Sequence, residues 1–244
     1  MKLTFLGTGS AINAGDFGAS LLINENILID APGGITQTLR KLGGEISKLD
    51  TIIITHLHGD HVFGLPFLLL EYILKPRETP LSILAPAGAQ KLLIKLTELA
   101  FPGEEAERML AAARPFYIVH ADGKETTIKN VTVKSHRIPH GDIETYGIEV
   151  GEPGGKRIFY APDTSYGDEL VNIVETVDAA VLDATTSDPF LADHMSMKQV
   201  NDLAGEFPDK EFMLTHRSRY EIKPAAYSLS ANVRVPVAGD KFTY

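Results

Sequence analysis

The segment that most constrains this chain is His56-Leu57-His58-Gly59-Asp60-His61, which directly follows the apolar, β-branched run Thr51–Thr55. Imidazole and carboxylate groups suit a borderline metal such as zinc, and Gly59 lets the backbone turn tightly. His56 and His58 lie two residues apart and can project to one side of an extended chain, whereas Asp60 and His61 have to come from the turn beyond it. The segment offers more donors than one catalytic zinc would take, which indicates two metal ions about 3.5–4 Å apart.

Composition narrows the choice of ligands. The chain has 244 residues and no cysteine, which excludes thiolate nucleophiles, disulfides and Cys-ligated metal sites. Its formal charge of −9 argues against strong non-specific binding to nucleic acid, because such binding depends on basic side chains that neutralise phosphates. No stretch approaches the roughly 20 apolar residues of a membrane span, and the N-terminal residues lack the apolar region of a secretory signal. We therefore expect a cytoplasmic protein without a membrane partner.

Strand and helix patterns alternate along the whole chain, with no linker, repeat or block of charge. This organisation predicts a single domain over residues 1–244, in which two sheets pack together under outer helices. The expected strands are Leu3–Leu6, Ser20–Ile23, Ile27–Asp30, Thr51–Thr55, Thr127–Ser135, Tyr146–Val150, Arg157–Ala161, Ala179–Leu182 and Glu211–Thr215. The expected helices are Pro66–Leu74, Ala87–Phe101, Asp168–Val177 and Ser196–Phe207.

The run from Thr55 to Pro66 resembles the HxHxDH signature of the metallo-β-lactamase-fold hydrolases, and specifically that of the ribonuclease Z branch. The likeness extends over nearly the whole chain. Its other segments are Leu6-Gly7-Thr8-Gly9-Ser10, Leu28-Ile29-Asp30, Tyr160-Ala161-Pro162-Asp163-Thr164, Leu182-Asp183-Ala184-Thr185, His194-Met195-Ser196 and Leu214-Thr215-His216. Four positions depart from the family pattern: Pro162 stands in place of a glycine, Asp183 of a glutamate, Asn13 of a proline and Gly34 of a glutamate. The resemblance implies an α/β fold, an αββα sandwich of two mixed sheets, and a binuclear metal site.

The resemblance also implies the ligands of each metal. It assigns His56, His58 and a third-motif histidine to the first ion, Asp60, His61 and His216 to the second, and Asp163 to both. Two divalent ions are therefore expected, with zinc as the first choice and manganese or iron as alternatives.

Two histidines, His136 and His140, stand near the position of the third-motif histidine. His140 is followed by Gly141 and then by Tyr146-Gly147, which resembles the family's pattern with one extra residue. His136 lies within the preceding strand pattern. This favours His140 as the ligand and leaves His136 as the alternative.

His194 is not needed as a metal ligand. In the ribonuclease Z branch the matching histidine sits over the scissile phosphate, paired with an acidic residue, and donates a proton to the leaving group. Asp183 could hold this imidazole and favour its charged form. The resemblance thus implies His194, Asp183 and the metal-site residue Asp60 as catalytic residues.

One departure from the branch concerns substrate size. Ribonuclease Z usually inserts a long arm that grips tRNA between the third-motif histidine and the bridging aspartate, but His140 and Asp163 are only 23 positions apart. We therefore predict a phosphodiesterase that cleaves a small or short phosphodiester through a metal-bridging hydroxide, with RNA disfavoured as a partner. The alternatives are tRNA 3′-end processing and hydrolysis of a lactone, thioester or β-lactam.

Three further expectations concern the surroundings of the site. The loops after Gly64 and around Phe101–Arg114 are expected to build the pocket walls. Arg217 and Arg219, next to His216, are candidates for a basic patch, with a solvated helix start as the alternative. Dimers are common in the group, so a homodimer is one expected assembly.

Overall fold

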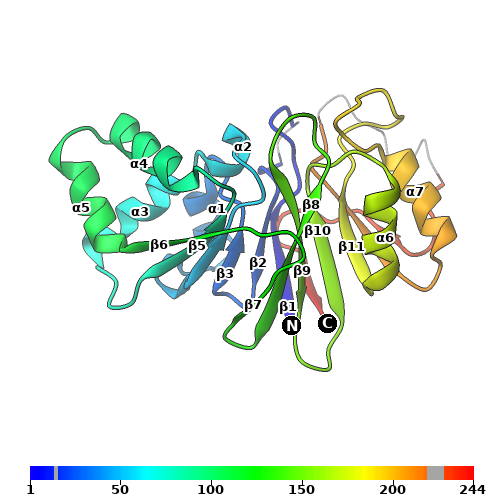
Figure 1. Cartoon of the computed structure of the whole chain (residues 1–244), viewed down its shortest axis with the longest axis horizontal. Helices are drawn as coiled ribbons and strands as arrows, with labels where there is room; N and C mark the ends of the chain where they lie inside the picture. Colours follow the sequence, from blue (N-terminus) through cyan, green and yellow to red (C-terminus); the bar gives the residue numbers. More distant parts are fainter. Residues whose placement is uncertain (14–15, 219–227) are drawn as a thin grey trace.

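Two sheets pack face to face, and helices cover both outer faces (Figure 1). The computed structural model describes residues 1–13, 16–218 and 228–244. In Figure 1 the helices α3, α4 and α5 lie on one outer side and α6 and α7 on the other. The α/β class and the αββα sandwich predicted from the sequence are confirmed. No helix among the described residues is long and apolar enough to cross a membrane.

The first sheet has the strand order β14-β1-β2-β3-β4-β5-β6. Its strands are β1 (Lys2–Gly7), β2 (Ser20–Ile23), β3 (Ile27–Ile29), β4 (Thr51–Ile53), β5 (Leu81–Ala85), β6 (Pro115–Val119) and β14 (Lys241–Thr243). The strands from β3 to β6 are parallel, and the remaining pairs are antiparallel. The helices on this side are α1 (Ile35–Lys41), α2 (Gly59–Val62), α3 (Leu65–Leu74), α4 (Ala89–Ala100) and α5 (Glu104–Ala113), with a 3₁₀ turn at Ile46–Lys48.

The second sheet has the order β13-β12-β11-β10-β9-β8-β7. Its strands are β7 (Glu125–Ile128), β8 (Val131–Ile138), β9 (Thr145–Gly151), β10 (Arg157–Ala161), β11 (Ala179–Asp183), β12 (Glu211–Thr215) and β13 (Val233–Arg234). The strands from β10 to β13 are parallel. The helices α6 (Asp168–Thr176) and α7 (Met197–Glu206) cover its outer face, and the side chain of Ser196 caps α7 by accepting the backbone N–H of Gln199.

The side-chain alternation of the strands explains why the molecule has three apolar layers. In β2, Leu21 and Ile23 join the core between the two sheets, while Leu22 between them joins the core under the helices. Strands buried on both faces are apolar at every position, because successive side chains point to opposite sides. The outer face of the second sheet forms a third core with α6 and α7.

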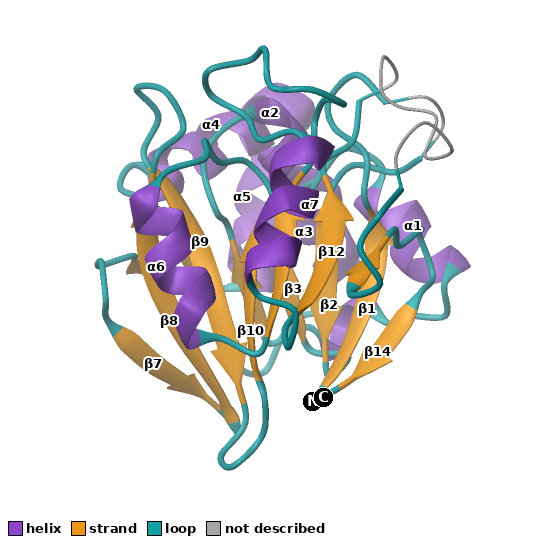
Figure 2. Ribbon diagram, turned by 90° about the vertical axis from the view of Figure 1, so that its right-hand side faces the viewer, coloured by secondary structure: helices purple, strands orange, loops and turns teal. Residues whose placement is uncertain are grey.

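The two chain ends meet at one edge of the sandwich, and the site lies at the opposite edge. The backbone N–H of Tyr244 donates to the carbonyl of Met1 over 2.9 Å, and β14 pairs with β1. Figures 1 and 2 show the ends at the bottom of the sandwich and α2, which follows β4, near its top. The parallel strands β3, β4, β11 and β12 therefore carry the residues that follow them to a common edge.

The sequence patterns miss some elements. The alternation over Thr127–Ser135 predicts one strand, but the structure has two, β7 and β8, with Ile128 paired to Val131. Only two residues turn the chain, and Lys129 among them has a φ of 55°. So short a turn keeps the alternation in phase, so the pattern does not reveal the reversal. The patterns also do not predict β5, β6 or α1. β5 and β6 are short apolar runs, and α1 has only seven residues, too few for a clear helical period.

Candidate metal centre and pocket

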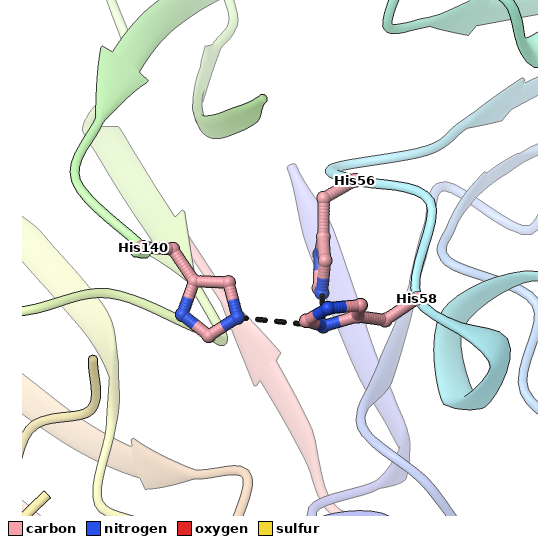
Figure 3. Close-up of side chains that lie close together, drawn as sticks. All are labelled: His56, His58 and His140. Carbon is pink, nitrogen blue, oxygen red and sulfur yellow. Dashed lines mark hydrogen bonds between the residues drawn. The ribbon is translucent and has the colours of Figure 1, made fainter. Parts of the chain in front are cut away.

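Three imidazoles converge between the two sheets. His56 follows β4, His58 precedes α2, and His140 follows β8. The nearest nitrogens of His56 and His58 are 3.1 Å apart, and those of His58 and His140 are 3.4 Å apart (Figure 3). Nδ1 of His140 lies 2.8 Å from the carbonyl of Asp193, which can only accept, so Nδ1 carries the proton and Nε2 is left to face the other two rings.

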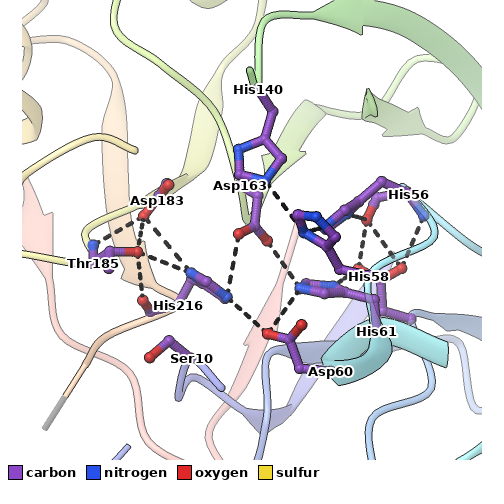
Figure 4. Close-up of polar contacts among 12 residues, drawn as sticks. Ser10, His56, His58, Asp60, His61, His140, Asp163, Asp183, Thr185 and His216 are labelled. Atoms are coloured by element: carbon purple, nitrogen blue, oxygen red, sulfur yellow. Dashed lines mark hydrogen bonds and ion pairs between the residues drawn. The ribbon is translucent and has the colours of Figure 1, made fainter. Parts of the chain in front are cut away.

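A second group lies beside the first and is centred on a buried carboxylate. Oδ2 of Asp163 is 2.9 Å from Nε2 of His61, and its Oδ1 is 3.2 Å from Nε2 of His216. Asp60, in the first turn of α2, reaches within 3.3 Å of His216 and 3.5 Å of His61 (Figure 4). Asp163 therefore contacts two imidazoles of this group, and its carboxylate also lies within 4.8 Å of a ring nitrogen of His56. The donor atoms of each triad, His56/His58/His140 and Asp60/His61/His216, lie within 4.8 Å of one another, as a metal site requires.

Buried atoms without hydrogen bonds fit this interpretation. Nε2 of His61 and Oδ2 of Asp163 are buried and have no hydrogen-bond partner, although they face each other. Buried polar atoms are rarely left in this state, and a metal ion would satisfy both. The nitrogen and oxygen donors also match the chemistry of zinc and similar divalent ions. The residues present thus fit a metal centre.

The structure separates the two candidates for the third-motif histidine. His136 lies on β8 with its Nε2 2.8 Å from Glu149, and its ring packs edge-on against Phe159. Only His140 joins the cluster with His56 and His58 among the described residues. The geometry therefore favours His140, as the sequence does.

Sequence reasoning misses the groups that orient the ligands. The buried carboxylate of Asp30 lies 2.9 Å from Nδ1 of His61 and accepts the backbone N–H of Thr55 over 2.8 Å. The hydroxyl of Thr55 lies 3.1 Å from Nδ1 of His56. Contacts of this kind fix the ring orientation and tautomer of metal ligands. The available signal is Asp30 itself, a charged residue at the end of an apolar strand run.

The electrostatics of the cluster combine imidazoles that resist protonation with carboxylates that stay ionised. Burial lowers the pKa of His56 well below its ordinary value, and burial also lowers the pKa of His58. Burial opposes a charge on His61, but the carboxylates of Asp163 and Asp30 raise the pKa of His61 well above its ordinary value. Burial likewise opposes a charge on Asp60, yet hydrogen bonds with His216 and His61 hold the pKa of that carboxyl below its ordinary value. A divalent ion would displace the proton of His61 and meet the same carboxylates.

Asp183 and His194 form a pair beside this cluster. Nδ1 of His194 lies 2.8 Å from Oδ2 of Asp183 and 3.5 Å from Oδ1 of Asp163. Burial disfavours a charged ring, but the hydrogen bond and the charge of Asp183 raise the pKa of His194 above its ordinary value. Because Nδ1 faces Asp183, Nε2 is the nitrogen free to act elsewhere.

The pocket at the cluster has walls that differ from those predicted. It has a volume of about 400 Å³, and its described lining comes from the cluster, from residues 10–12 and from residues 185–191. Neither the loop after Gly64 nor the segment Phe101–Arg114 lines it, so that expectation is wrong. Phe101–Arg114 instead contains α5, which packs on α3 away from the strand ends. Ile12, Phe190 and Leu191 give the pocket an exposed apolar part.

The suggested basic patch is not formed by Arg217. Its guanidinium donates to the hydroxyl of Thr8 over 2.8 Å and lies 3.7 Å from Asp16, and it is not among the pocket-lining residues. Asp16 and Thr8 attract the side chain, so the prediction for Arg217 is wrong. Arg219 lies outside the described residues.

Comparison with solved structures identifies the fold as that of the metallo-β-lactamases. The metallo-β-lactamase fold protein YhfI from Bacillus subtilis matches with a TM-score of 0.80 and 19% identity, covering 99% of this chain and 98% of that chain. Human tRNase Z, short form, matches with a TM-score of 0.76 and 23% identity over 100% and 99% of the two chains. A diphosphatase from the PhnP family gives a TM-score of 0.77 at 18% identity, over 100% and 97%.

The chain belongs to the family of the anti-Pycsar protein Apyc1, whose model matches residues 1–227. Among curated proteins, the ribonuclease Z of Brevibacillus brevis is 29% identical over 94% of this chain and 89% of that protein. The ribonuclease Z of Salinibacter ruber is 31% identical over 60% of this chain and 46% of that protein, so the match spans about half of that relative. Fold and relatives together make the chain a ribonuclease Z-like, metal-dependent hydrolase of the metallo-β-lactamase fold.

Proposed function

We propose that this chain is a phosphodiesterase that uses two divalent metal ions, zinc in the first instance, to cleave a small or short phosphodiester. Under this proposal His56, His58 and His140 would hold one ion, Asp60, His61 and His216 would hold the other, and Asp163 would serve both. The ions, when bound, would activate water as the nucleophile and neutralise charge that develops on the phosphoryl oxygens. The remaining steps fall to the chain's own residues.

The observation that carries the proposal is the pairing of His194 with Asp183 at the pocket wall. Asp183 holds Nδ1 of His194, which leaves Nε2 to carry a proton toward the substrate. That proton would pass to the alkoxide oxygen as the phosphorus–oxygen bond breaks. A phosphodiester with an alkyl leaving group needs such an acid, because an alkoxide is a poor leaving group without a proton.

The size of the pocket supports a small substrate. A volume of about 400 Å³ lies in the range of roughly 300–1,000 Å³ that is typical of small-molecule sites. Every residue between His140 and Asp163 is described, and the interval holds only β9, β10 and short turns. No arm that could hold an RNA is present in that interval.

A second candidate function is tRNA 3′-end processing. It is favoured by the relative from Brevibacillus brevis, which is named ribonuclease Z and aligns over 94% of this chain. A ribonuclease would have to bind its RNA through surfaces other than the interval between His140 and Asp163.

A substrate panel tests these functions against one another. The zinc-loaded protein is assayed with bis(p-nitrophenyl) phosphate, a dinucleoside monophosphate, a precursor tRNA with a 3′ trailer and a set of lactones. We expect the highest kcat/KM among the small diesters and loss of activity after chelation. A higher kcat/KM on precursor tRNA would favour the second candidate, and metal-dependent activity on the lactones alone would overturn both.

A further inference from the structure

The hydroxyl of Thr185 lies between the imidazoles of His194 and His216, on the second sheet's side of the site. Its Oγ1 lies 2.6 Å from Oδ1 of Asp183 and 2.9 Å from Nδ1 of His216 (Figure 4). Thr185 follows β11 by two residues, and its own N–H also donates to Oδ1 of Asp183 over 2.9 Å. Only 7% of the residue is exposed, so water competes little for these contacts.

Counting protons gives each contact a direction. A threonine hydroxyl has one proton, and two oxygens near it can only accept: the carboxylate of Asp183 at 2.6 Å and the backbone carbonyl of His216 at 3.0 Å. The shorter, charge-assisted contact with Asp183 takes the proton. The lone pairs of Oγ1 then face Nδ1 of His216, so this nitrogen has to be the donor. His194 is 3.3 Å from the same hydroxyl but 2.8 Å from Oδ2 of Asp183, and its proton goes to the carboxylate.

The direction of the bond matters for the proposed metal site. If Nδ1 of His216 carries the proton, Nε2 presents its lone pair toward Asp60 and Asp163, which lie 3.3 Å and 3.2 Å away. A neutral imidazole can bind a metal through only one nitrogen, so the tautomer of His216 decides whether its Nε2 is available to bind the ion. The backbone of His216 is constrained as well, because its φ of 54° is uncommon for a residue other than glycine. Backbone conformations of this kind cluster at functional sites.

We propose that Thr185 is a positioning residue that links Asp183 to His216, so that one buried carboxylate orients both the proton donor and a metal ligand. Oδ2 of Asp183 holds His194 directly, and Oδ1 holds His216 through the hydroxyl. The functional consequence of this link rests on the proposed metal centre, but the tautomer of His216 does not depend on any substrate.

The first test measures that tautomer in the wild-type protein loaded with zinc. Long-range ¹H–¹⁵N correlation spectra of ¹⁵N-histidine-labelled protein, with His216 assigned by its His216→Gln variant, distinguish Nδ1–H from Nε2–H. We expect Nδ1–H at His216. A proton on Nε2 overturns the proposal without any Thr185 variant having to fold.

The second test compares Thr185→Val, which keeps the shape but loses the hydroxyl, with Thr185→Ser, which keeps it. Zinc affinity is measured by competition with a chromophoric chelator. In Thr185→Val we expect one of the two ions to bind about 10- to 100-fold more weakly, with the other little changed, and Thr185→Ser to restore it. The matched control is Thr97→Val, because Thr97 is a fully buried threonine of α4 whose hydroxyl donates to Leu93.

Kinetics then separate this proposal from the proposed function. If the protein is a phosphodiesterase, Thr185→Val should lower kcat about tenfold or more while KM changes little, because valine keeps the shape of the pocket wall but no longer orients the reacting groups. Equal zinc affinities in Thr185→Val and the wild type overturn the role of Thr185. Weaker zinc binding in a protein that cleaves no phosphodiester supports the role of Thr185 and overturns the proposed function alone.

Discussion

Asp30, at the end of β3 in the first sheet, accepts hydrogen bonds from a threonine, Thr55, and lies 2.9 Å from an imidazole, His61. Asp183, at the end of β11 in the second sheet, has corresponding partners: it accepts a hydrogen bond from a threonine, Thr185, and lies 2.8 Å from an imidazole, His194. Both carboxylates are fully buried, and each accepts a backbone N–H from the end of a neighbouring strand, that of Thr55 for Asp30 and that of Thr164 for Asp183. Each sheet thus supplies one charged group that orients imidazoles between the layers.

The two units differ in what they leave accessible. His61 on the first sheet is almost fully buried, whereas the side chain of His194 on the second sheet is 20% exposed and lines the pocket. The first unit can therefore act only on a ligand inside the cluster. The second holds a group that can meet a substrate. The difference indicates that the first-sheet unit serves metal binding alone, whereas the second-sheet unit orients both a metal-site imidazole, His216, and the proton donor, His194.

The largest effect should come from the exposed imidazole. In His194→Gln we expect metal content to stay unchanged and turnover of a diester with an alkyl leaving group to fall about 10²- to 10⁴-fold, because the acid is gone. A p-nitrophenolate leaving group needs little protonation, so bis(p-nitrophenyl) phosphate should lose much less. Elemental analysis and steady-state rates check both points. Equal losses on the two substrates would contradict proton donation.

His120 provides an imidazole without a carboxylate in contact, at the junction of the two sheets. Its Nε2 donates to the carbonyl of Ile54, and its Nδ1 accepts from the hydroxyl of Ser135. Burial lowers the pKa of His120 to about 4. The unfolded chain takes up this proton below its ordinary pKa of about 6.5, so the folded state loses stability as the pH falls from 6.5 toward 4.

The loss should reach about 3 kcal/mol and level off below pH 4. It is measured as the difference in free energy of unfolding between the wild type and His120→Gln, which keeps a donor and an acceptor but cannot become charged. Because both proteins carry the same metal ligands, acid release of metal cancels in the difference. Parallel stability curves between pH 6.5 and pH 4 would show that His120 does not titrate as the structure indicates.

The first-sheet unit should act through metal affinity. In Asp30→Asn we expect zinc to bind about 10- to 100-fold more weakly, with turnover recovering when zinc is in excess, because the variant disturbs the orientation of His61 and no substrate contact. Chelator competition and activity against zinc concentration measure the two effects. Asp50→Asn is the control, since Asp50 precedes β4 at the opposite edge of the sheet. A turnover that stays low in saturating zinc would mean that Asp30 does more than orient a ligand.

The sequence predicts the imidazole cluster well because its signal is local. His56, His58, Asp60 and His61 follow one buried strand, and the glycine after His58 permits the turn. His140 can be distinguished from His136 because position relative to the end of a strand decides which side chain reaches the edge. Strand ends of this kind are visible in a sequence even when the order of the strands is not.

The residues that contact the cluster from distant parts of the sequence are much harder to predict. The pairing of Asp30 with His61 spans 31 residues, and that of Thr185 with His216 also spans 31. Arg217 illustrates the opposite error. It follows His216 of the site in sequence, but its own side chain contacts Thr8 and Asp16 outside the pocket. Such partners depend on which strands become adjacent, and no short pattern records that.

The smallest effect should come from the apolar rim of the pocket, which belongs to the second sheet's side of the site. Phe190 is 75% exposed and lines the pocket near Leu191, so its ring is free to contact an aromatic group of a substrate. Loss of about 1 kcal/mol of aromatic contact in Phe190→Ala should raise KM for bis(p-nitrophenyl) phosphate about fivefold and leave kcat nearly unchanged. Methyl p-nitrophenyl phosphate, with one ring fewer, should be affected less. Phe116→Ala on β6 is the control, because Phe116 is also exposed but does not line this pocket. A fall in kcat instead of a rise in KM would mean that Phe190 acts with the groups that orient His194 and not as a contact for the substrate.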